Sequence, residues 1–305
     1  MFKHLLVPLD GSQMAERALP AACHLSKAMG SRVTLLHIVE RDAPHEIHGE
    51  KHLTAADDAR EYLQDMVVRL FPGPALIDRV VELEESSGIA RRIQEYASVS
   101  GADLIVMCTH GRSGLRHLFA GSNAQQVIAS GNTAVLQIRP QKGGEQVFSL
   151  RRVLVPLDGK AEHEPGLEAS VRLARTFSSE LQILMVVPTR QTLRGDSAVA
   201  AKISPRAAAA LLDLSLKEAE EYLQRRIDVL HKEGLPVAGS IERGDAADEI
   251  LRMAKRGGMD LIIVATHRKV GADAFWSGSV AAKITNRSPV PVLLIPVSDA
   301  GTAIG

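Results

Sequence analysis

Two kinds of hydrophobic pattern alternate along this sequence. Leu104–Met107 and Leu261–Val264 are apolar at every position, which is typical of parallel strands buried on both faces. Within Leu63–Leu70, the apolar residues include the first, fourth, fifth and eighth positions, as on the buried side of a helix. Ser204 followed by Pro205 predicts another helix start, because serine caps free amide groups and proline suits the first turn. Strands that alternate with helices predict right-handed crossovers and open parallel sheets covered on both faces.

The same order of segments occurs twice. The run LLVPLDG at Leu5–Gly11 returns as VLVPLDG at Val153–Gly159, and CTHGRSGLRHLFAGS at Cys108–Ser122 returns as ATHRKVGADAFWSGS at Ala265–Ser279. Internal repetition of this kind indicates two copies of one domain. We therefore predict two tandem α/β domains, residues 1–142 and 149–298, each a Rossmann-like fold around an open parallel five-stranded sheet. The polar segment Gln141–Gln146 is the expected linker.

Composition narrows the class of protein. The 305 residues include 36 lysines and arginines and 36 aspartates and glutamates, so no overall basic field attracts nucleic acid or an anionic membrane. No apolar run approaches the roughly 20 residues that cross a bilayer. The two cysteines, Cys23 and Cys108, have no CxxC spacing, which argues against a disulfide framework or a structural zinc site. We expect a cytoplasmic protein without nucleic-acid or membrane partners.

The carboxyl ends of the predicted strands form the expected ligand edge. Asp10 ends the first strand, Val39 ends the second, and the loop from Cys108 follows the fourth, so three segments should converge there. That loop ends at Ser122, a candidate N-cap whose helix offers free amide groups and a positive dipole end. Both features favour an anion, and a phosphate group is the expected one.

Two glycines in this loop, Gly111 and Gly121, would let the backbone approach such a phosphate, because glycine tolerates positive φ and has no Cβ. Arg112 and Arg116 add positive charge. The alternative is that the glycines only form turns and the arginines only face water. The chain has no GxxxxGKS/T, GxGxxG or GxSxG motif, and no set of acid, base and nucleophile occurs in both halves. Enzymatic activity is therefore not predicted from the residues.

Two further features have competing interpretations. His45, His48 and His52 lie close enough in sequence to bind a transition metal, but we prefer a solvated loop and predict no metal ligands. Cys108, next to the expected anion site, is either a redox-sensitive thiol or a small residue that packs at a strand end.

The segments VPLDGS and THGRSGLRHLFAGS together resemble the universal stress protein family, and the doubled arrangement resembles its tandem members. The resemblance covers residues 3–145 and 150–297. It implies a fold similar to the adenine nucleotide alpha hydrolases. Members that bind ATP carry the pattern G-x2-G-x9-G-S/T after the fourth strand, which implies ATP in the first half and Mg²⁺ only together with ATP. The implied binding residues are Pro8, Leu9, Asp10, Val39, Met107, Cys108, His110, Gly111, Arg112, Gly121, Ser122 and Asn123.

The second half departs further from that pattern. Ala265 and Arg268 stand where the pattern has glycines, whereas in the first half only the opening glycine is replaced, by Cys108. Asp273 also adds negative charge to the second loop. We therefore predict a regulatory module with one competent adenine-nucleotide site, in the first half.

Two other functions stay open, and assembly adds a further expectation. One alternative is a tandem scaffold of the stress response that binds no nucleotide. The other is slow ATP hydrolysis or autophosphorylation, which the resemblance implies and for which the sequence shows no dedicated base. The halves are expected to pair as a pseudo-dimer through their fifth strands, Ala134–Ile138 and Pro291–Ile295, and the resemblance implies a homodimer of whole chains.

Overall fold

The computed structural model describes residues 1–40, 46–47, 50–51, 53–71, 76–83, 88–109, 123–139, 148–193, 198–199, 204–267 and 279–297. The three histidines His45, His48 and His52 and the expected linker lie outside these residues. The chain divides into two compact units, of which Met1–Ser149 forms most of the first and Leu150–Thr266 most of the second. No helix in the described part is long and apolar enough to cross a membrane.

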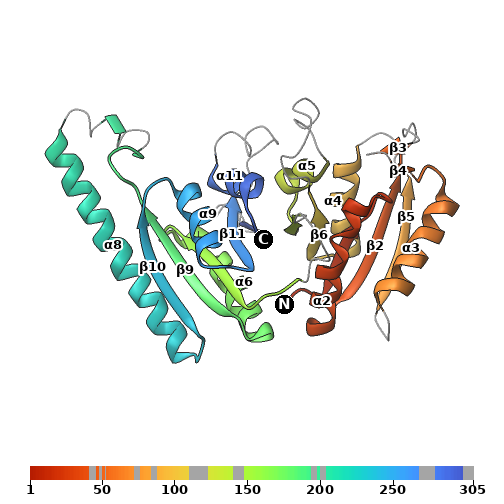
Figure 1. Cartoon of the computed structure of the whole chain (residues 1–305), viewed down its shortest axis with the longest axis horizontal. Helices are drawn as coiled ribbons and strands as arrows, with labels where there is room; N and C mark the ends of the chain where they lie inside the picture. Colours follow the sequence, from red (N-terminus) through yellow and green to blue (C-terminus); the bar gives the residue numbers. More distant parts are fainter. Residues whose placement is uncertain are drawn as a thin grey trace, which may run out of the picture. The chain divides into compact units, whose positions relative to one another are not determined.

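The first unit contains a parallel sheet with strand order β7-β6-β1-β2-β5. Leu5 of β1 lies opposite Val33 of β2 and Leu104 of β6, so β1 is the central strand. The strand order reverses beside β1, which is where open α/β sheets bind ligands. The elements, coloured red to yellow-green in Figure 1, are β1 (His4–Pro8), α1 (Gln13–Glu16), α2 (Leu19–Met29), β2 (Arg32–Val39), β3 (Glu46–Ile47), β4 (Glu50–Lys51), α3 (Ala56–Leu70), β5 (Ile77–Leu83), α4 (Ile89–Ser100), β6 (Leu104–Cys108), α5 (Asn123–Ser130) and β7 (Ala134–Ile138).

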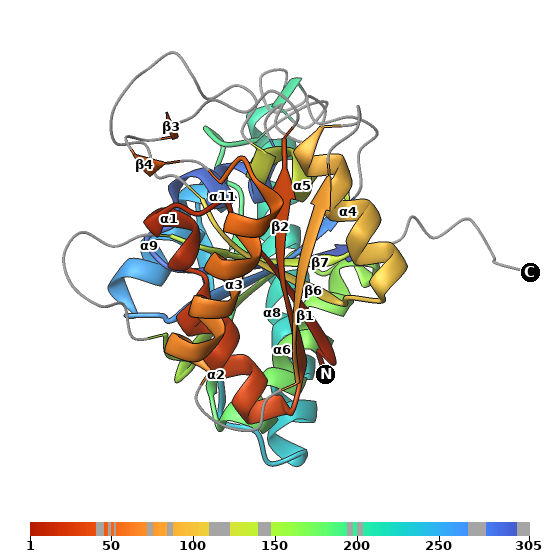
Figure 2. The same ribbon diagram turned by 90° about the vertical axis from the view of Figure 1, so that its right-hand side faces the viewer.

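Helices cover both faces of this sheet. α2 and α3 contact each other and the strands β1, β2 and β5, whereas α4 contacts α5. Figure 2 shows α3 and α4 on opposite sides of β2 and β5. Side chains on both faces of the central strands are buried, including Leu5, Leu6, Leu35 and Leu36. This burial explains why the strand sequences are apolar at successive positions.

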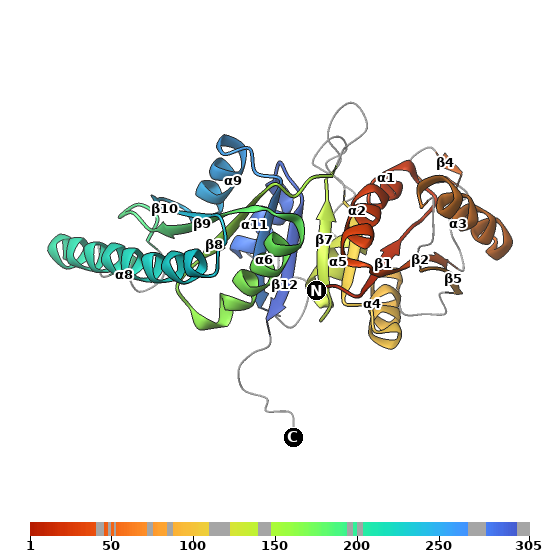
Figure 3. The ribbon, with the colours of Figure 1, turned by 90° about the horizontal axis from the view of Figure 1, so that it is seen from below.

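The second unit repeats the architecture with strand order β10-β9-β8-β11-β12. α6 contacts β8 and β9, α8 lies along β9 and β10, and α9 contacts α11. Figure 3 shows α8 and α9 on opposite faces of the sheet. The elements are β8 (Arg152–Leu157), η1 (Ala161–His163), α6 (Glu164–Phe177), β9 (Glu180–Val187), α8 (Pro205–Lys232), β10 (Val237–Arg243), α9 (Ala246–Arg256), β11 (Leu261–His267), α11 (Val280–Arg287) and β12 (Val292–Val297).

Local sequence signals account for most of these elements. The predicted strands Leu104–Met107 and Leu261–Val264 lie within β6 and β11. The predicted cap of α8 is confirmed, because the Ser204 side chain accepts a hydrogen bond from Ala207 N at 3.3 Å. The loop expected around His45 to His52 instead holds the short antiparallel pair β3–β4. Strands of this length, and the short helices α1 and η1, are too brief to show a hydrophobic period.

Candidate functional site

Asp10 follows β1 at the carboxyl edge of the first sheet. Its Oδ1 accepts hydrogen bonds from Ser12 N at 3.0 Å and Ser12 Oγ at 2.6 Å. Gly11, with φ of 89°, forms the turn between them, a conformation that favours glycine. Ser12 Oγ also accepts from Ala15 N at 3.2 Å and so caps α1. Within the described part of the chain no group donates to Asp10 Oδ2, which leaves this exposed carboxylate an open acceptor position.

The end of β2 lies at the same edge and is held there by a buried histidine. Val39, the last residue of β2, is buried. His37 is completely buried, with Nδ1 2.8 Å from Leu9 O and Nε2 3.1 Å from Leu53 O. These contacts connect the ends of β1 and β2 to the segment before α3. The sequence pattern did not single out His37, although a histidine within the apolar run VTLLHIV signals a buried polar group that needs partners.

Cys108 ends β6 next to α1. Its sulfur lies 3.7 Å from the sulfur of Met14. Burial raises the pKa of the Cys108 thiol to about 12, with the nearby Arg17 acting in the opposite direction. Since a redox-sensitive cysteine needs a lowered pKa, the raised pKa favours the interpretation of Cys108 as a packing residue. Met107, the preceding residue, is buried.

The first residue after β6 is anchored to β7. Thr109 N donates to Ile138 O at 3.1 Å, and Gln137 Nε2 donates to Thr109 Oγ1. Both Thr109 and Gln137 are buried, and the sequence pattern singled out neither. Gln137 is a polar residue within the otherwise apolar strand AVLQI, which is the signal that could have identified it. The start of the glycine-containing loop is therefore fixed to the sheet.

The structure brings one group of the predicted site residues to the same edge of the sheet. These are Pro8, Leu9, Asp10, Val39, Met107 and Cys108. The helix expected after the loop is present as α5, and its first residue, Asn123, is exposed. The other predicted residues lie outside the described part of the chain: His110, Gly111, Arg112, Gly121 and Ser122.

The corresponding aspartate of the second half has different partners. Asp158 Oδ1 lies 2.8 Å from His163 Nδ1 and accepts from Lys160 N at 3.1 Å. Asp158 Oδ2 lies 3.9 Å from Lys160 Nζ. Both carboxylate oxygens of Asp158 therefore have a basic neighbour, whereas the described residues donate hydrogen bonds to one oxygen of Asp10 only. The serine of this half that corresponds to Ser122 is a helix cap, because the Ser279 side chain accepts a hydrogen bond from Ala282 N at 3.1 Å at the start of α11.

Comparison with known proteins agrees with the internal repeat. The model of the universal stress protein family matches residues 1–139 and again residues 149–296. The chain belongs to this family. Because both halves match, this universal stress protein has two tandem family domains.

Individual relatives show the same relationship. Universal stress protein YxiE of Bacillus subtilis is 29% identical over 152 residues, which are 46% of this chain and 100% of YxiE. A Thermus aquaticus universal stress protein, from the 3′ region of a QAH/OAS sulfhydrylase, is 33% identical over 141 residues, covering 46% of this chain and 100% of its own. A universal stress protein structure from Archaeoglobus fulgidus matches with a TM-score of 0.68 and 18% identity, covering 96% of this chain and 98% of that one. That structure shares the fold along nearly the whole length.

Proposed function

We propose that this universal stress protein binds ATP or a related adenine nucleotide in its first half and acts as a cytoplasmic regulatory module. The observation that carries the proposal is the difference between the two equivalent aspartates. Asp10 offers an open acceptor oxygen beside the point where the strand order reverses, whereas Asp158 is engaged by His163 and Lys160. Such an acceptor suits the hydroxyl groups of a ribose.

The proposed site has two parts. Asp10 and Val39 lie near the adenine and ribose. The phosphates lie over Gly111, Gly121 and Ser122, where glycines permit close approach and the following helix α5 offers amide groups. The sequence pattern of this loop supports the second part, and the geometry of β1 and β2 supports the first. If Mg²⁺ accompanies the nucleotide, it arrives as the ATP complex.

Titration calorimetry with ATP tests this proposal. We expect about one ATP per chain. Replacing Gly121 with valine should weaken binding at least about tenfold, which corresponds to roughly 1.4 kcal/mol. Gly278→Val, the matched change in the second half, should leave the affinity unchanged. Two equivalent sites per chain, or unchanged binding in Gly121→Val, would contradict the proposal.

A scaffold that binds no nucleotide is the second candidate, and one observation favours it. The position that opens the glycine pattern is occupied by Cys108, which packs against Met14. The same calorimetry distinguishes the candidates, because a scaffold gives no heat of binding with ATP at any accessible concentration. Hydrolysis or autophosphorylation would add a slow step to the first candidate, and homodimer formation is compatible with both.

A further inference from the structure

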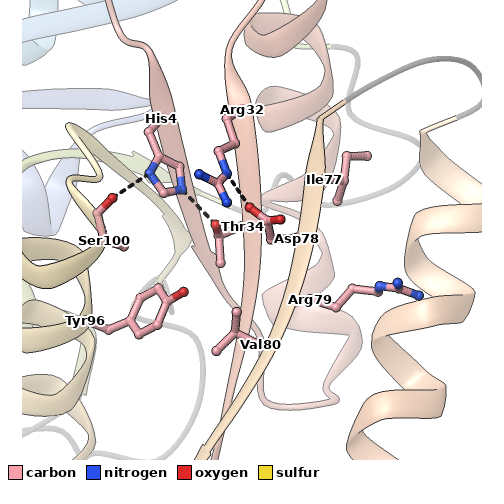
Figure 4. A pocket seen from close by; sticks show the side chains of 9 residues that line it. All are labelled: His4, Arg32, Thr34, Ile77, Asp78, Arg79, Val80, Tyr96 and Ser100. Atoms are coloured by element: carbon pink, nitrogen blue, oxygen red, sulfur yellow. Dashed lines mark hydrogen bonds and ion pairs between the residues drawn. The ribbon is translucent and has the colours of Figure 1, made fainter.

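A pocket of about 490 Å³ lies at the opposite edge of the first sheet from Asp10. It is lined at the amino ends of β1, β2 and β5 and by the last turns of α4. Figure 4 shows its side chains, which come from α4 on one side and from the strands β1, β2 and β5 on the other. Its residues are His4, Arg32, Thr34, Ile77, Asp78, Arg79, Val80, Tyr96 and Ser100.

Strand register places opposite charges next to each other in this pocket. His4 of β1 pairs with Arg32 of β2, and Thr34 of β2 pairs with Asp78 of β5. Because residues two apart on a strand face the same way, these four side chains share one face of the sheet. Tyr96 reaches toward this face from α4 (Figure 4).

Hydrogen bonds connect the polar floor of the pocket. His4 is buried, with Nε2 2.7 Å from Thr34 Oγ1 and Nδ1 3.2 Å from Ser100 O. Both ring nitrogens therefore have a polar neighbour, and the histidine connects β1 to β2 and α4. A ligand would therefore meet side chains that already have hydrogen-bond partners.

The charged groups above this floor have further atoms that can form hydrogen bonds with a ligand. Arg32 Nε donates to Asp78 Oδ2, and this ion pair uses one donor of the guanidinium and one oxygen of the carboxylate. Among the described residues, the terminal amino groups of Arg32, Asp78 Oδ1 and the Tyr96 hydroxyl form no hydrogen bond or ion pair. A positive donor group and a negative acceptor atom thus lie side by side, with a neutral donor opposite them.

The second half provides an internal comparison. A hollow of about 450 Å³ occupies the equivalent place, but Glu180, Gln182 and Ala238 stand where the first half has Arg32, Thr34 and Asp78. Gln182 Nε2 is already bonded to Ile183 O and Ser240 Oγ, each at 3.2 Å. The hollow is therefore a property of the fold. Opposite charges occur in both halves, since Arg152 of β8 lies opposite Glu180 of β9. The Arg32–Asp78 ion pair has no counterpart in the second half, because Ala238 stands at the position of Asp78.

We propose that the pocket of the first half binds a small zwitterionic amino acid. Its carboxylate accepts from the terminal amino groups of Arg32 and from the Tyr96 hydroxyl, and its ammonium group donates to Asp78 Oδ1. An amino acid carries a partner for both charges. A simple anion would lie next to the Asp78 carboxylate, and a simple cation would lie next to the Arg32 guanidinium, so each would be repelled by one of the two groups. Val80 and the Tyr96 ring provide apolar contact for a hydrophobic side chain (Figure 4). The volume suits a ligand of this size.

An NMR titration of the full-length, nitrogen-15-labelled chain with L-leucine tests the assignment. We expect saturable shifts of the Thr34, Asp78 and Tyr96 amides and none around Gln182 and Ala238. The matched analogues 4-methylpentanoate, which lacks the ammonium group, and isoamylamine, which lacks the carboxylate, should each bind at least about tenfold more weakly. No saturable shift with leucine, or equal affinity for either analogue, would overturn the proposal.

Variants assign the contacts. Arg32→Gln and Asp78→Asn should each weaken leucine binding at least about tenfold, and Tyr96→Phe about threefold or more. Arg60→Gln changes an exposed arginine of α3 that pairs with Asp57 and should leave binding unchanged. Unchanged amide shifts of first-half residues away from the pocket, such as those of α2, report that each variant is folded. Leucine binding that is insensitive to all three pocket variants would place the ligand elsewhere and overturn the proposal. ATP titration of the same samples reports separately on the nucleotide site.

Discussion

His163 Nδ1 lies 2.8 Å from Oδ1 of Asp158, the aspartate of the second half that corresponds to Asp10. The equivalent position in the first half is Ala15, which has no polar side chain. The two halves therefore differ at the aspartate as well as in the glycine loop. This difference leads to the first test of a single nucleotide site.

Replacing Asp10 with asparagine should weaken ATP binding at least about tenfold, because the amide presents a donor group and no charge to the ribose. Asp158→Asn is the matched control and should leave the affinity for ATP unchanged. Titration calorimetry measures both. Equal losses in the two variants would show that the second half takes part in binding.

Arg268→Gly should give the second half weak ATP binding. If the loop needs positive φ at this position, a non-glycine residue costs on the order of 1–3 kcal/mol, and its Cβ occupies space that a phosphate would use. The test is best made in a Gly121→Val chain, so that the first site does not mask the second. Adding His163→Ala should strengthen the restored binding, because it removes a neighbour from Asp158. An Arg268 that itself binds phosphate would instead give a second site in the unmodified chain and lose it in Arg268→Gly.

Gly11→Ala should destabilise the first half more than Gly30→Ala. Both glycines have positive φ, 89° and 65°, so alanine costs about 1 kcal/mol or more at either position. At Gly11 the added Cβ would also lie 3.0 Å from side-chain atoms of Leu53, whereas at Gly30 it meets nothing within 4 Å. Thermal unfolding followed by circular dichroism measures the difference. Equal shifts in melting temperature would mean that Leu53 moves aside without cost.

Cys108 should resist alkylation by iodoacetamide in the folded protein. With a pKa of about 12, only on the order of one thiol in ten thousand is thiolate at pH 8. The same residue should react readily in guanidinium chloride, and peptide mass spectrometry quantifies both. Folding raises the pKa of this thiol, so the protonated thiol contributes to the free energy of unfolding. This contribution is fully present below the thiol pKa of the unfolded chain, about 8.5, and declines as pH rises toward 12. Cys108→Ala should lack this part of the pH dependence of stability. Rapid labelling of Cys108 in the folded chain would contradict the predicted resistance to alkylation.

Much of the architecture followed from the sequence because its causes are local or repeated. Hydrophobic periodicity separates strands such as β6 from helices such as α3, and the cap at Ser204 depends only on its neighbours in the chain. Asp10 and Val39 could be assigned to one edge because parallel strands end at the same side of their sheet. The pairing of the two halves through their fifth strands stays a prediction.

The tertiary structure alone decided which segments that are distant in sequence contact each other. The register of β1, β2 and β5 brings Arg32 to Asp78 and Thr34 to His4, and no local pattern encodes that register. Cys108 is a packing residue because α1 places Met14 beside it and burial removes water from the thiol. The sequence determined which elements form and that they form twice, since backbone propensity and hydrophobic period act over a few residues. Which side chains meet was decided by the folded packing, since it depends on how distant elements are aligned.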